Sequence, residues 1–574
     1  MRFVADGYQV LLRDDAVLVA DADGRAWSRL SMLASVHRVD VLDESYDLGE
    51  LQVTERDDAV EVSLTCACSA WAAKTVLLRC LPDRLEYAVR VTGVGTLANV
   101  QLLGGRALLP SGACGVFRSS TEFASVFDPT PTEPIQVVRS AATAATLGVV
   151  GDASPGRLHG IFAPPPLCLA FGRATPGDPT AVPGGDWLSI GVVAGVDQLR
   201  FTEMRYAPED DGFLLELDYD GHTSVHGEFR TPTLVLRPAA DPWQALATYR
   251  TDLVSRGLAP TGPVSPVADW WREPIFCGWG AQVAARDRPA AELSRHDCYD
   301  EWLATLAEHG IVPGTVVIDD QWEAVYGSGE PHPDRWPQLR EWIAARHAAG
   351  QRVLLWWKTW DAAALRPEQC VVTPSGAPLA ADPASPAYLS HLTEVVARLL
   401  RPDGLDADGF KVDFLQCSPA GHSLRRPGAP ADAPWGIALL HALLTALYAA
   451  SKAAKPDALV ITHTPHPAFG DVTDMVRLND ILGTSPTGAR VPPIAQLAFR
   501  HAVVAASMPD HLIDTDQWPI ATRDEWRAYV AEQGRRGVPS LYYVAGLDQP
   551  DEVLDADDLA LVAAAWRKYR SGVP

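Results

Sequence analysis

From the N-terminus to about residue 238, hydrophobic and polar residues alternate in short runs that predict β-strands. Such runs occur at 16–20, 60–64, 85–91 and 214–217, and turn-forming Asp and Gly residues separate strands at 21–24 and 93–95. Strands without long helices between them favour antiparallel sheets packed face to face. We therefore expect an N-terminal antiparallel β-sandwich over residues 1–240.

The pattern changes at Asp241. A proline-started segment runs from there to Gly257, with apolar residues at helical spacing (Trp243, Leu246, Tyr249 and Leu253). A loop rich in proline and glycine follows at 260–266. Residues 241–265 are thus predicted to form a linker helix and loop that end the sandwich.

The rest of the chain, 266–574, alternates apolar strand-like runs with amphipathic helices. The predicted strands are 275–280, 315–320, 352–357, 409–414, 458–463, 475–480, 511–516 and 540–545. The predicted helices are 292–309, 336–349, 386–400, 436–453, 493–506, 523–534 and 557–569. Eight strand-helix units favour closure into a (β/α)8 TIM barrel. Since the last helix reaches the end of the sequence, we expect no C-terminal β-domain.

Charge and composition narrow the choice of partners. The chain has 574 residues and a formal net charge of −24, which would repel nucleic acid and an anionic membrane surface. The N-terminus lacks a basic stretch followed by an apolar run, and we expect no apolar run to span a bilayer. A cytoplasmic protein is therefore expected, with self-association left open.

Nine cysteines are scattered along the chain without the Cys-x-x-Cys spacing of a zinc site. Alternation in 62–68 places Cys66 and Cys68 on one face of a strand, where packing into the core is the expected role. Reduced thiols are the expectation for all nine.

In a (β/α)8 barrel the active site lies where the loops after the strands converge. A ring of carboxylates and tryptophans at these positions suits a sugar, whose hydroxyls accept and donate hydrogen bonds and whose C–H faces stack on aromatic rings. The predicted strand ends carry Trp279, Asp319, Asp320, Trp356, Lys358, Lys411, Asp413, His463, Arg477, Asp480, Asp514, Asp516 and Tyr542. A small oligosaccharide or α-glycoside is the expected substrate.

Retaining cleavage of a glycosidic bond needs two carboxyl groups about 5–5.5 Å apart, one ionised and one protonated. Asp413 ends the fourth predicted strand, and Lys411 points to the same side and would keep it ionised, which favours Asp413 as nucleophile. Asp480, at the end of the sixth strand, is the predicted acid/base. Asp471 and Asp474 are alternatives if the strand boundary shifts.

Four segments together resemble clan D glycoside hydrolases, which include α-galactosidases (melibiases, family 36), raffinose synthases and α-glucosidases. Gly-Phe-Lys-Val-Asp-Phe at 409–414 resembles the nucleophile strand of that clan, and Val-Ile-Asp-Asp-Gln-Trp at 317–322 resembles its Asp-Asp-Gly-Trp signature. Arg-Leu-Asn-Asp at 477–480 resembles the acid/base segment, and Asp-Pro-Ala-Ser-Pro at 382–386 the element before strand four. The resemblance implies a β-sandwich ahead of the barrel, catalysis by Asp413 and Asp480, and no cofactor.

By the same resemblance, Asp319 and Asp320 would bind sugar hydroxyls. Alternation along a strand allows only one of the pair to point into the barrel mouth, so at least one is expected to be structural. Lys411, Arg477, Trp279, Trp356 and His463 complete the predicted substrate-binding set.

The sequence also departs from the α-galactosidase pattern. Gln321 replaces a glycine, Thr-His-Thr-Pro-His-Pro at 462–467 stands where a cysteine and glycines are usual, and Lys358 stands where an acidic residue is expected. The identity of the sugar is therefore left open.

The main prediction is a retaining, exo-acting α-glycosidase of α-galactosidase type without a metal. Three alternatives are kept: a transglycosidase of raffinose-synthase type, a non-catalytic carbohydrate-binding protein on the same barrel, and a metal-dependent hydrolase. The last would use His463, His466, Asp514 and Asp516, but no His-x-His pair follows the first strand.

Overall fold

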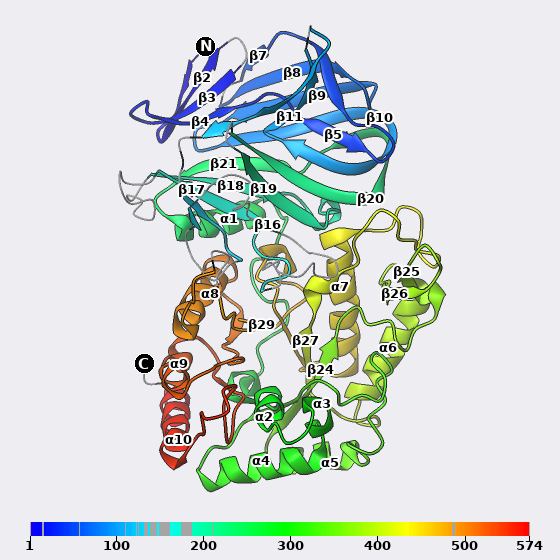
Figure 1. The fold of residues 1–574 in the computed structure, drawn as a ribbon, viewed down its shortest axis with the longest axis vertical. Coiled ribbons are helices and arrows are strands. Elements are labelled where there is room, and N and C mark those ends of the chain that lie inside the picture. Colours follow the sequence, from blue (N-terminus) through cyan, green and yellow to red (C-terminus); the bar gives the residue numbers. More distant parts are fainter. Residues whose placement is uncertain are drawn as a thin grey trace.

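The computed structural model describes residues 2–13, 16–56, 58–109, 111–121, 123, 125–130, 136–137, 146–147, 161–173, 186–209, 212–484 and 488–572. Its first part is all β and lies above the barrel in Figure 1. The strands form one five-stranded and one 16-stranded sheet, and of the described pairings only that of β6 with β11 is parallel. They are β1 (Arg2–Val4), β2 (Tyr8–Arg13), β3 (Ala16–Asp21), β4 (Ala26–Leu30), β5 (Ser35–Arg38), β6 (Glu44–Leu48), β7 (Gln52–Glu55), β8 (Val60–Cys68), β9 (Ala73–Cys80), β10 (Leu85–Leu102), β11 (Gly104–Leu108), β12 (Cys114–Arg118), β13 (Ser120–Thr121), β14 (Ser125–Phe127), β15 (Gln136–Val137), β16 (Thr146–Leu147), β17 (Cys168–Gly172), β18 (Trp187–Val193), β19 (Glu203–Glu209), β20 (Gly212–Arg230) and β21 (Thr233–Ala239).

Period-two alternation builds this part, as the sequence predicts. In β8, Val60, Val62, Leu64, Cys66 and Cys68 are all buried, while the residues between them are partly or fully exposed. The prediction that Cys66 and Cys68 pack into the core is confirmed. The long strands β10 and β20 pair with each other, and β10 also pairs with β5, β9 and β21, so they join several branches of one sheet.

Helix α1 (Pro242–Ser255) links the two parts of the chain. Asp241 caps it by accepting a hydrogen bond from the Gln244 backbone N–H (2.8 Å). Its buried Tyr249 donates to the carbonyl of Val192 in β18 (2.9 Å) and lies 3.0 Å from Nε2 of His466, which follows a barrel strand. The predicted linker helix is therefore present and contacts both parts.

The second part is an eight-stranded parallel barrel, as predicted. Its strands are β22 (Ile275–Cys277), β23 (Thr315–Ile318), β24 (Arg352–Lys358), β27 (Gly409–Asp413), β28 (Leu459–Thr462), β29 (Met475–Arg477), β30 (Leu512–Asp514) and β31 (Ser540–Leu541). They pair in chain order, and β22 pairs with β31. An isolated parallel bridge between Asp514 and Val538 nearly closes the ring between β30 and β31.

Helices surround this barrel (Figure 1). They are α2 (Trp279–Ala284), α3 (Ala290–Leu293), α4 (His296–Glu308), α5 (Leu339–Ala348), α6 (Pro386–Leu400), α7 (Gly436–Ala454), α8 (Pro493–Ser507), α9 (Arg523–Arg536) and α10 (Ala556–Arg570). A two-stranded hairpin, β25 (Cys370–Val372) with β26 (Pro378–Ala381), lies between β24 and α6 and was not predicted.

The predicted strands were too long at their C-terminal ends. Strand β22 stops at Cys277, so Trp279 begins a helix instead of ending a strand. Likewise Asp320, His463 and Asp480 lie in the loops that follow β23, β28 and β29. Parallel strands of a barrel need only a few paired residues each, and the apolar run continues into the buried loop.

Helix α7 corrects another expectation, since its 19 residues are long and apolar enough to cross a membrane by length and composition. Half of it is buried inside the protein, and it packs against α6. Its apolar character is accounted for by this packing on the barrel.

Candidate active site

Arg477 lies at the centre of the barrel mouth, where the C-terminal ends of the strands meet. Its guanidinium contacts three carboxylates: Nη2 is 2.8 Å from Asp413 Oδ1, and Nη1 is 2.8 Å from Asp516 Oδ2 and 3.3 Å from Asp480 Oδ1. These side chains come from the ends of β27, β29 and β30. One buried cation thus brings the two predicted catalytic carboxyl groups together.

Three carboxylates share one guanidinium, so their pKa values separate. Burial would raise the pKa of Asp413, but the positive charges of Arg477 and Lys411 hold it well below its usual range. Burial would also raise the pKa of Asp516, but the charges of Arg477 and Lys411 lower it below its usual value. Both groups are therefore ionised at neutral pH.

Asp480 behaves in the opposite way. Burial, opposed by Arg477 but reinforced by the charges of Asp413 and Asp516, raises its pKa to about 7. Its side chain is 48% exposed, so the carboxyl group also borders solvent. Of the three carboxyl groups that contact Arg477, Asp480 is the one whose pKa is raised.

Further contacts hold Asp413 in place. Trp356 donates from Nε1 to Asp413 Oδ2 (3.2 Å), and the Phe414 backbone N–H donates to Oδ1 (2.8 Å). His463 Nε2 lies 3.9 Å from the same Oδ1. The carboxylate is thus oriented from three sides by Arg477, Trp356 and the backbone.

Lys411 helps to lower the pKa of Asp413 through its charge, as expected, but its direct partner is another carboxylate. Its Nζ pairs with Asp319 Oδ2 at 2.8 Å, and the Cys277 thiol donates to the same oxygen (3.0 Å). Lys411 and Asp319 are both almost completely buried. Asp319 is therefore the structural member of the Asp319–Asp320 pair, and Lys411 acts on Asp413 only through its charge.

Asp320 faces the mouth instead. It accepts a hydrogen bond from the Tyr326 hydroxyl (2.5 Å), and burial raises its pKa. Lys358, which pairs with Asp361 at 2.8 Å, places its ammonium 4.1 Å from the centre of the Tyr326 ring. Sequence reasoning missed Tyr326, because it lies in a long loop with no periodic pattern.

Aromatic rings border this region. Trp279 packs edge-on against Trp518, which follows β30, with ring centres 5.7 Å apart. Trp356 packs edge-on against Phe414 at 6.0 Å. Trp356 is almost fully buried, so its described role is to orient Asp413, while Trp279 remains half-buried at the mouth.

The backbone after the strands is unusual. Residues in the left-handed region other than glycine cluster here, each following a barrel strand: Gln321, Trp360, Phe414, Asn479 and Asp516. Non-glycine residues adopt this conformation at a cost and often at functional sites. The turns direct the neighbouring side chains toward the mouth.

The two alternative acids lie elsewhere. Asp474 precedes β29 and is bound by Lys452 (2.7 Å), the Tyr448 hydroxyl (2.8 Å) and the Val460 backbone N–H (2.9 Å). Asp471 is partly exposed and pairs with His441. Neither contacts Arg477 in the described structure, so Asp480 is the candidate that geometry favours.

The residues of the metal-dependent alternative have other partners. His466 lies against Tyr249 and accepts from the Ala468 backbone N–H (3.2 Å). Asp514 accepts from the Ser540 hydroxyl and from the Asp516 backbone. Among the described residues, these groups form no set with the spacing of metal ligands.

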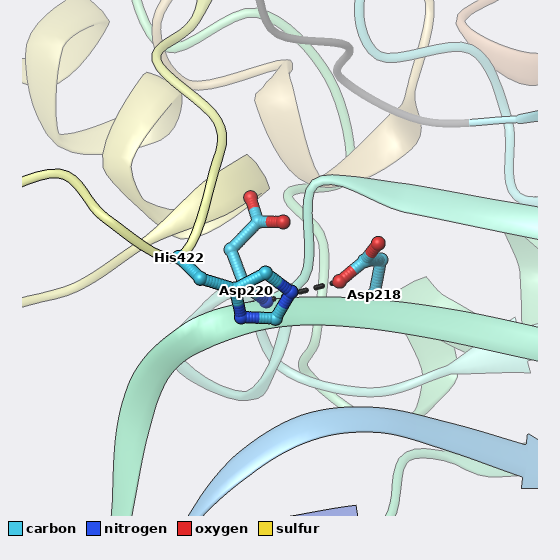
Figure 2. A group of neighbouring side chains, drawn as sticks. All are labelled: Asp218, Asp220 and His422. Carbon is cyan, nitrogen blue, oxygen red and sulfur yellow. Dashed lines mark hydrogen bonds between the residues drawn. The ribbon is translucent and has the colours of Figure 1, made fainter. Parts of the chain in front are cut away.

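A different set has such spacing. Potential ligand atoms of Asp218, Asp220 and His422 lie within 4.8 Å of one another where a turn of β20 meets a barrel loop (Figure 2). The cavity of about 570 Å³ that Asp218 and His422 line also contains Arg38 and Arg106, whose charges disfavour a cation. The set therefore stands as a contact between the two parts of the chain.

These features define a class: a (β/α)8 barrel with an N-terminal antiparallel β-domain and a mouth lined by carboxylates on a buried arginine. No family model matches the chain, and no curated protein matches it. Solved structures do.

An α-galactosidase from Thermus thermophilus, in complex with stachyose, aligns with a TM-score of 0.52 and 16% identity over 90% of this chain and 99% of that one. A GH31 sulfoquinovosidase from E. rectale with an aza-sugar inhibitor aligns at 0.58 and 10%, over 99% and 82%. The cycloalternan-forming enzyme of Listeria monocytogenes, with a pentasaccharide, aligns at 0.53 and 10%, over 100% and 55%.

These neighbours are carbohydrate-active enzymes, of the clan D kind in the case of the first two. At identities this low the alignments show only that the chain shares the fold of these proteins. The likeness does not distinguish the α-galactosidase family from the others.

Proposed function

We propose that this protein is a retaining, exo-acting α-glycosidase that removes a terminal α-linked sugar from a small oligosaccharide or glycoside. One observation carries the proposal: Asp413 and Asp480 contact the same guanidinium, yet the pKa of Asp413 is lowered and that of Asp480 is raised to about 7. An ionised nucleophile beside a protonated acid is the pair that this chemistry requires.

In the first step an oxygen of Asp413 attacks the anomeric carbon and forms an ester bond with it. The bond between that carbon and the leaving oxygen breaks, and the proton of Asp480 moves to the leaving oxygen. In the second step Asp480, now ionised, takes a proton from water as the water oxygen displaces Asp413. The acid is thereby restored, and no cofactor is consumed.

The surrounding residues have distinct proposed roles. Asp320 and the Nε2 of His463 would contact sugar hydroxyls, and Trp279 with Trp518 offers an aromatic surface to a C–H face of a sugar. Asp319 and Lys411 would support the base of the site from below without contacting the reacting atoms.

The fold neighbours support a glycoside substrate, since they include an α-galactosidase and a sulfoquinovosidase. These two neighbours are named for different sugars. The sugar that this protein acts on therefore has to be identified by assay.

The test is a screen of aryl α-glycosides (galactoside, glucoside, sulfoquinovoside and N-acetylgalactosaminide) with the wild type and Asp413→Ala. We expect turnover of one of them by the wild type and a loss of at least about 10³-fold in Asp413→Ala, because the covalent step is removed. Incubation with a slow fluorinated substrate of the same sugar should leave a glycosyl adduct that mass spectrometry maps to Asp413.

Asp471→Asn is the matched control, because it changes an acidic residue that lies between β28 and β29 and pairs with His441. Its activity should equal that of the wild type. An adduct on another residue, or equal turnover by Asp413→Ala, would contradict the assignment. Binding of sugars without turnover of any glycoside would point to a carbohydrate-binding protein, and transfer to an added acceptor sugar to a transglycosidase.

A further inference from the structure

A short segment of the N-terminal domain, Ile161–Phe162–Ala163, reaches the barrel mouth. The Ala163 backbone N–H donates to the His463 carbonyl (3.0 Å), and the Ile161 carbonyl accepts from Nδ2 of Asn479 (2.6 Å). All three residues of the segment are buried. The loops after β28 and β29 are thus both fixed by one piece of the sandwich domain.

Asn479 joins this segment to the candidate active site. It directly precedes Asp480, adopts a left-handed conformation (φ 65°) and is buried. Besides the Ile161 carbonyl, its amide nitrogen lies 3.2 Å from Nδ1 of His463. One side chain therefore contacts the N-terminal domain, the loop that carries Asp480, and His463.

The contact fixes where His463 carries its proton. An amide nitrogen can only donate, so Nδ1 accepts in this contact and the ring hydrogen lies on Nε2. The Ile161 carbonyl also interacts with the ring and would favour the other tautomer, but it accepts from Asn479 instead. The other tautomer would set an N–H group against the amide N–H. Burial and the charge of Arg477 lower the pKa of His463 to about 3, so the ring is neutral.

The Nε2–H group has no hydrogen-bond partner although its ring is fully buried. It lies 3.9 Å from Asp413 Oδ1. A buried donor without a partner costs free energy that a ligand oxygen can recover.

We propose that Asn479 is a positioning residue through which the N-terminal domain sets the tautomer of His463, so that Nε2–H is presented to a hydroxyl of the sugar bound beside Asp413. The inference rests on the proposed glycosidase function. It makes the sandwich domain part of the active site, because the Ile161 carbonyl orients the amide that orients the histidine.

Asn479→Asp tests the proposal, since the new carboxylate has the same shape but only accepts. The hydrogen of His463 should move to Nδ1, where it bonds the carboxylate, and Nε2 should lose its donor. We expect kcat/KM on the glycoside that the wild type cleaves to fall roughly tenfold, as for the loss of one buried hydrogen bond. A monodeoxy substrate that lacks the contacted hydroxyl should show a smaller difference between the two proteins.

The tautomer is read directly from ¹⁵N chemical shifts of histidine-labelled full-length protein, with the His463 signals assigned by their loss in His463→Gln. The wild type should show hydrogen on Nε2, and Asn479→Asp should show it on Nδ1. Arg200→Ala is the control, because it removes another hydrogen bond between the N-terminal domain and the barrel. This bond runs from Arg200 to the Asp432 carbonyl (3.2 Å) and involves neither His463 nor Asn479. It should change neither reading.

Hydrogen on Nδ1 in the wild type would overturn the proposal even if Asn479→Asp did not fold. So would an unchanged tautomer or an unchanged kcat/KM in folded Asn479→Asp. The expected tautomers in a protein that cleaves no glycoside would instead refute the proposed function while leaving the contact between the domain and His463 established.

Discussion

At the residue scale, the protonation of the mouth is decided by competition for Arg477. Asp413 and Asp516 each lie 2.8 Å from its nitrogens, while Asp480 lies at 3.3 Å. Burial and the charges of Asp413 and Asp516 raise the pKa of Asp480 to about 7, whereas Arg477 holds the pKa of the two closer carboxyl groups low. The proposed acid and nucleophile would differ because of this arrangement, although both are aspartates.

This arrangement predicts a pH profile. An acid with a pKa of about 7 is active below that pH and loses its proton as pH rises, so kcat/KM for an aryl glycoside with a poor leaving group should fall above about pH 7. Asp480→Asn should lose activity on that substrate about 10²- to 10⁴-fold. A dinitrophenyl leaving group needs no protonation. On a dinitrophenyl glycoside, Asp480→Asn should therefore lose much less of the rate of the first step.

The comparison between the two leaving groups separates acid catalysis from a folding defect, which would affect both substrates equally. An unchanged alkaline limb in Asp480→Asn would assign the acid to another residue.

At the element scale, the loop after β29 owes its shape to helix α8. Arg500 donates from Nη1 to the carbonyls of Leu478 (3.0 Å), Asn479 (2.8 Å) and Asp480 (2.7 Å). Burial lowers the pKa of Arg500 to about 10, so it is still charged at neutral pH. A helix cation thus replaces the regular hydrogen bonds that this turn lacks.

Arg500→Met should therefore destabilise the fold by about 3 kcal/mol, because three buried carbonyls lose their donor. Activity should fall as well, since Asp480 is carried by the same turn. Chemical denaturation and kcat/KM measure the two effects. Arg535→Met, which removes an exposed partner of Glu532 on α9, should change the free energy of unfolding by less than about 0.5 kcal/mol.

Equal stability of Arg500→Met and the wild type would show that the turn is held by other contacts. The most direct alternative is the bond between Asn479 and the Ile161 carbonyl.

At the scale of the whole molecule, buried carboxyl groups make stability depend on pH. Burial raises the pKa of Glu323 to about 7, and burial together with Asp516 raises that of Asp514 to about 6. A raised folded-state pKa means that the folded protein binds more protons than the unfolded chain. Stability is then complete below the unfolded value and decreases as pH rises toward the folded one.

We therefore expect the melting temperature of the wild type to decrease relative to that of Glu323→Gln between about pH 5 and pH 8. Glu323→Gln keeps the acceptor for the Gly329 backbone N–H but cannot ionise, and it should remove about 3 kcal/mol of this dependence. Glu330→Gln, at an exposed pair with Arg398, should leave the curve unchanged. Parallel curves for the wild type and Glu323→Gln over this interval would contradict the assignment for Glu323.

Much of this protein follows from its sequence. Strand alternation predicts the N-terminal sheets, and eight apolar runs separated by amphipathic helices predict the barrel, because burial of one face or stripe imposes a period on the chain. The positions of Asp413, Arg477 and Asp480 at the C-terminal ends of two barrel strands also follow, since parallel strands end at the same rim. Their catalytic roles stay predictions.

What the tertiary structure decided is which charges share a partner. The sequence favoured Lys411 as the cation beside Asp413, whereas in the fold Lys411 pairs with Asp319 and Arg477 contacts Asp413. No pattern in the sequence predicts the contact between Ile161 and Asn479, which are 318 positions apart. Periodicity reports which face of an element is buried, but the pKa of a carboxyl group and the tautomer of a histidine depend on atoms a few ångströms away, and only the folded chain brings these together.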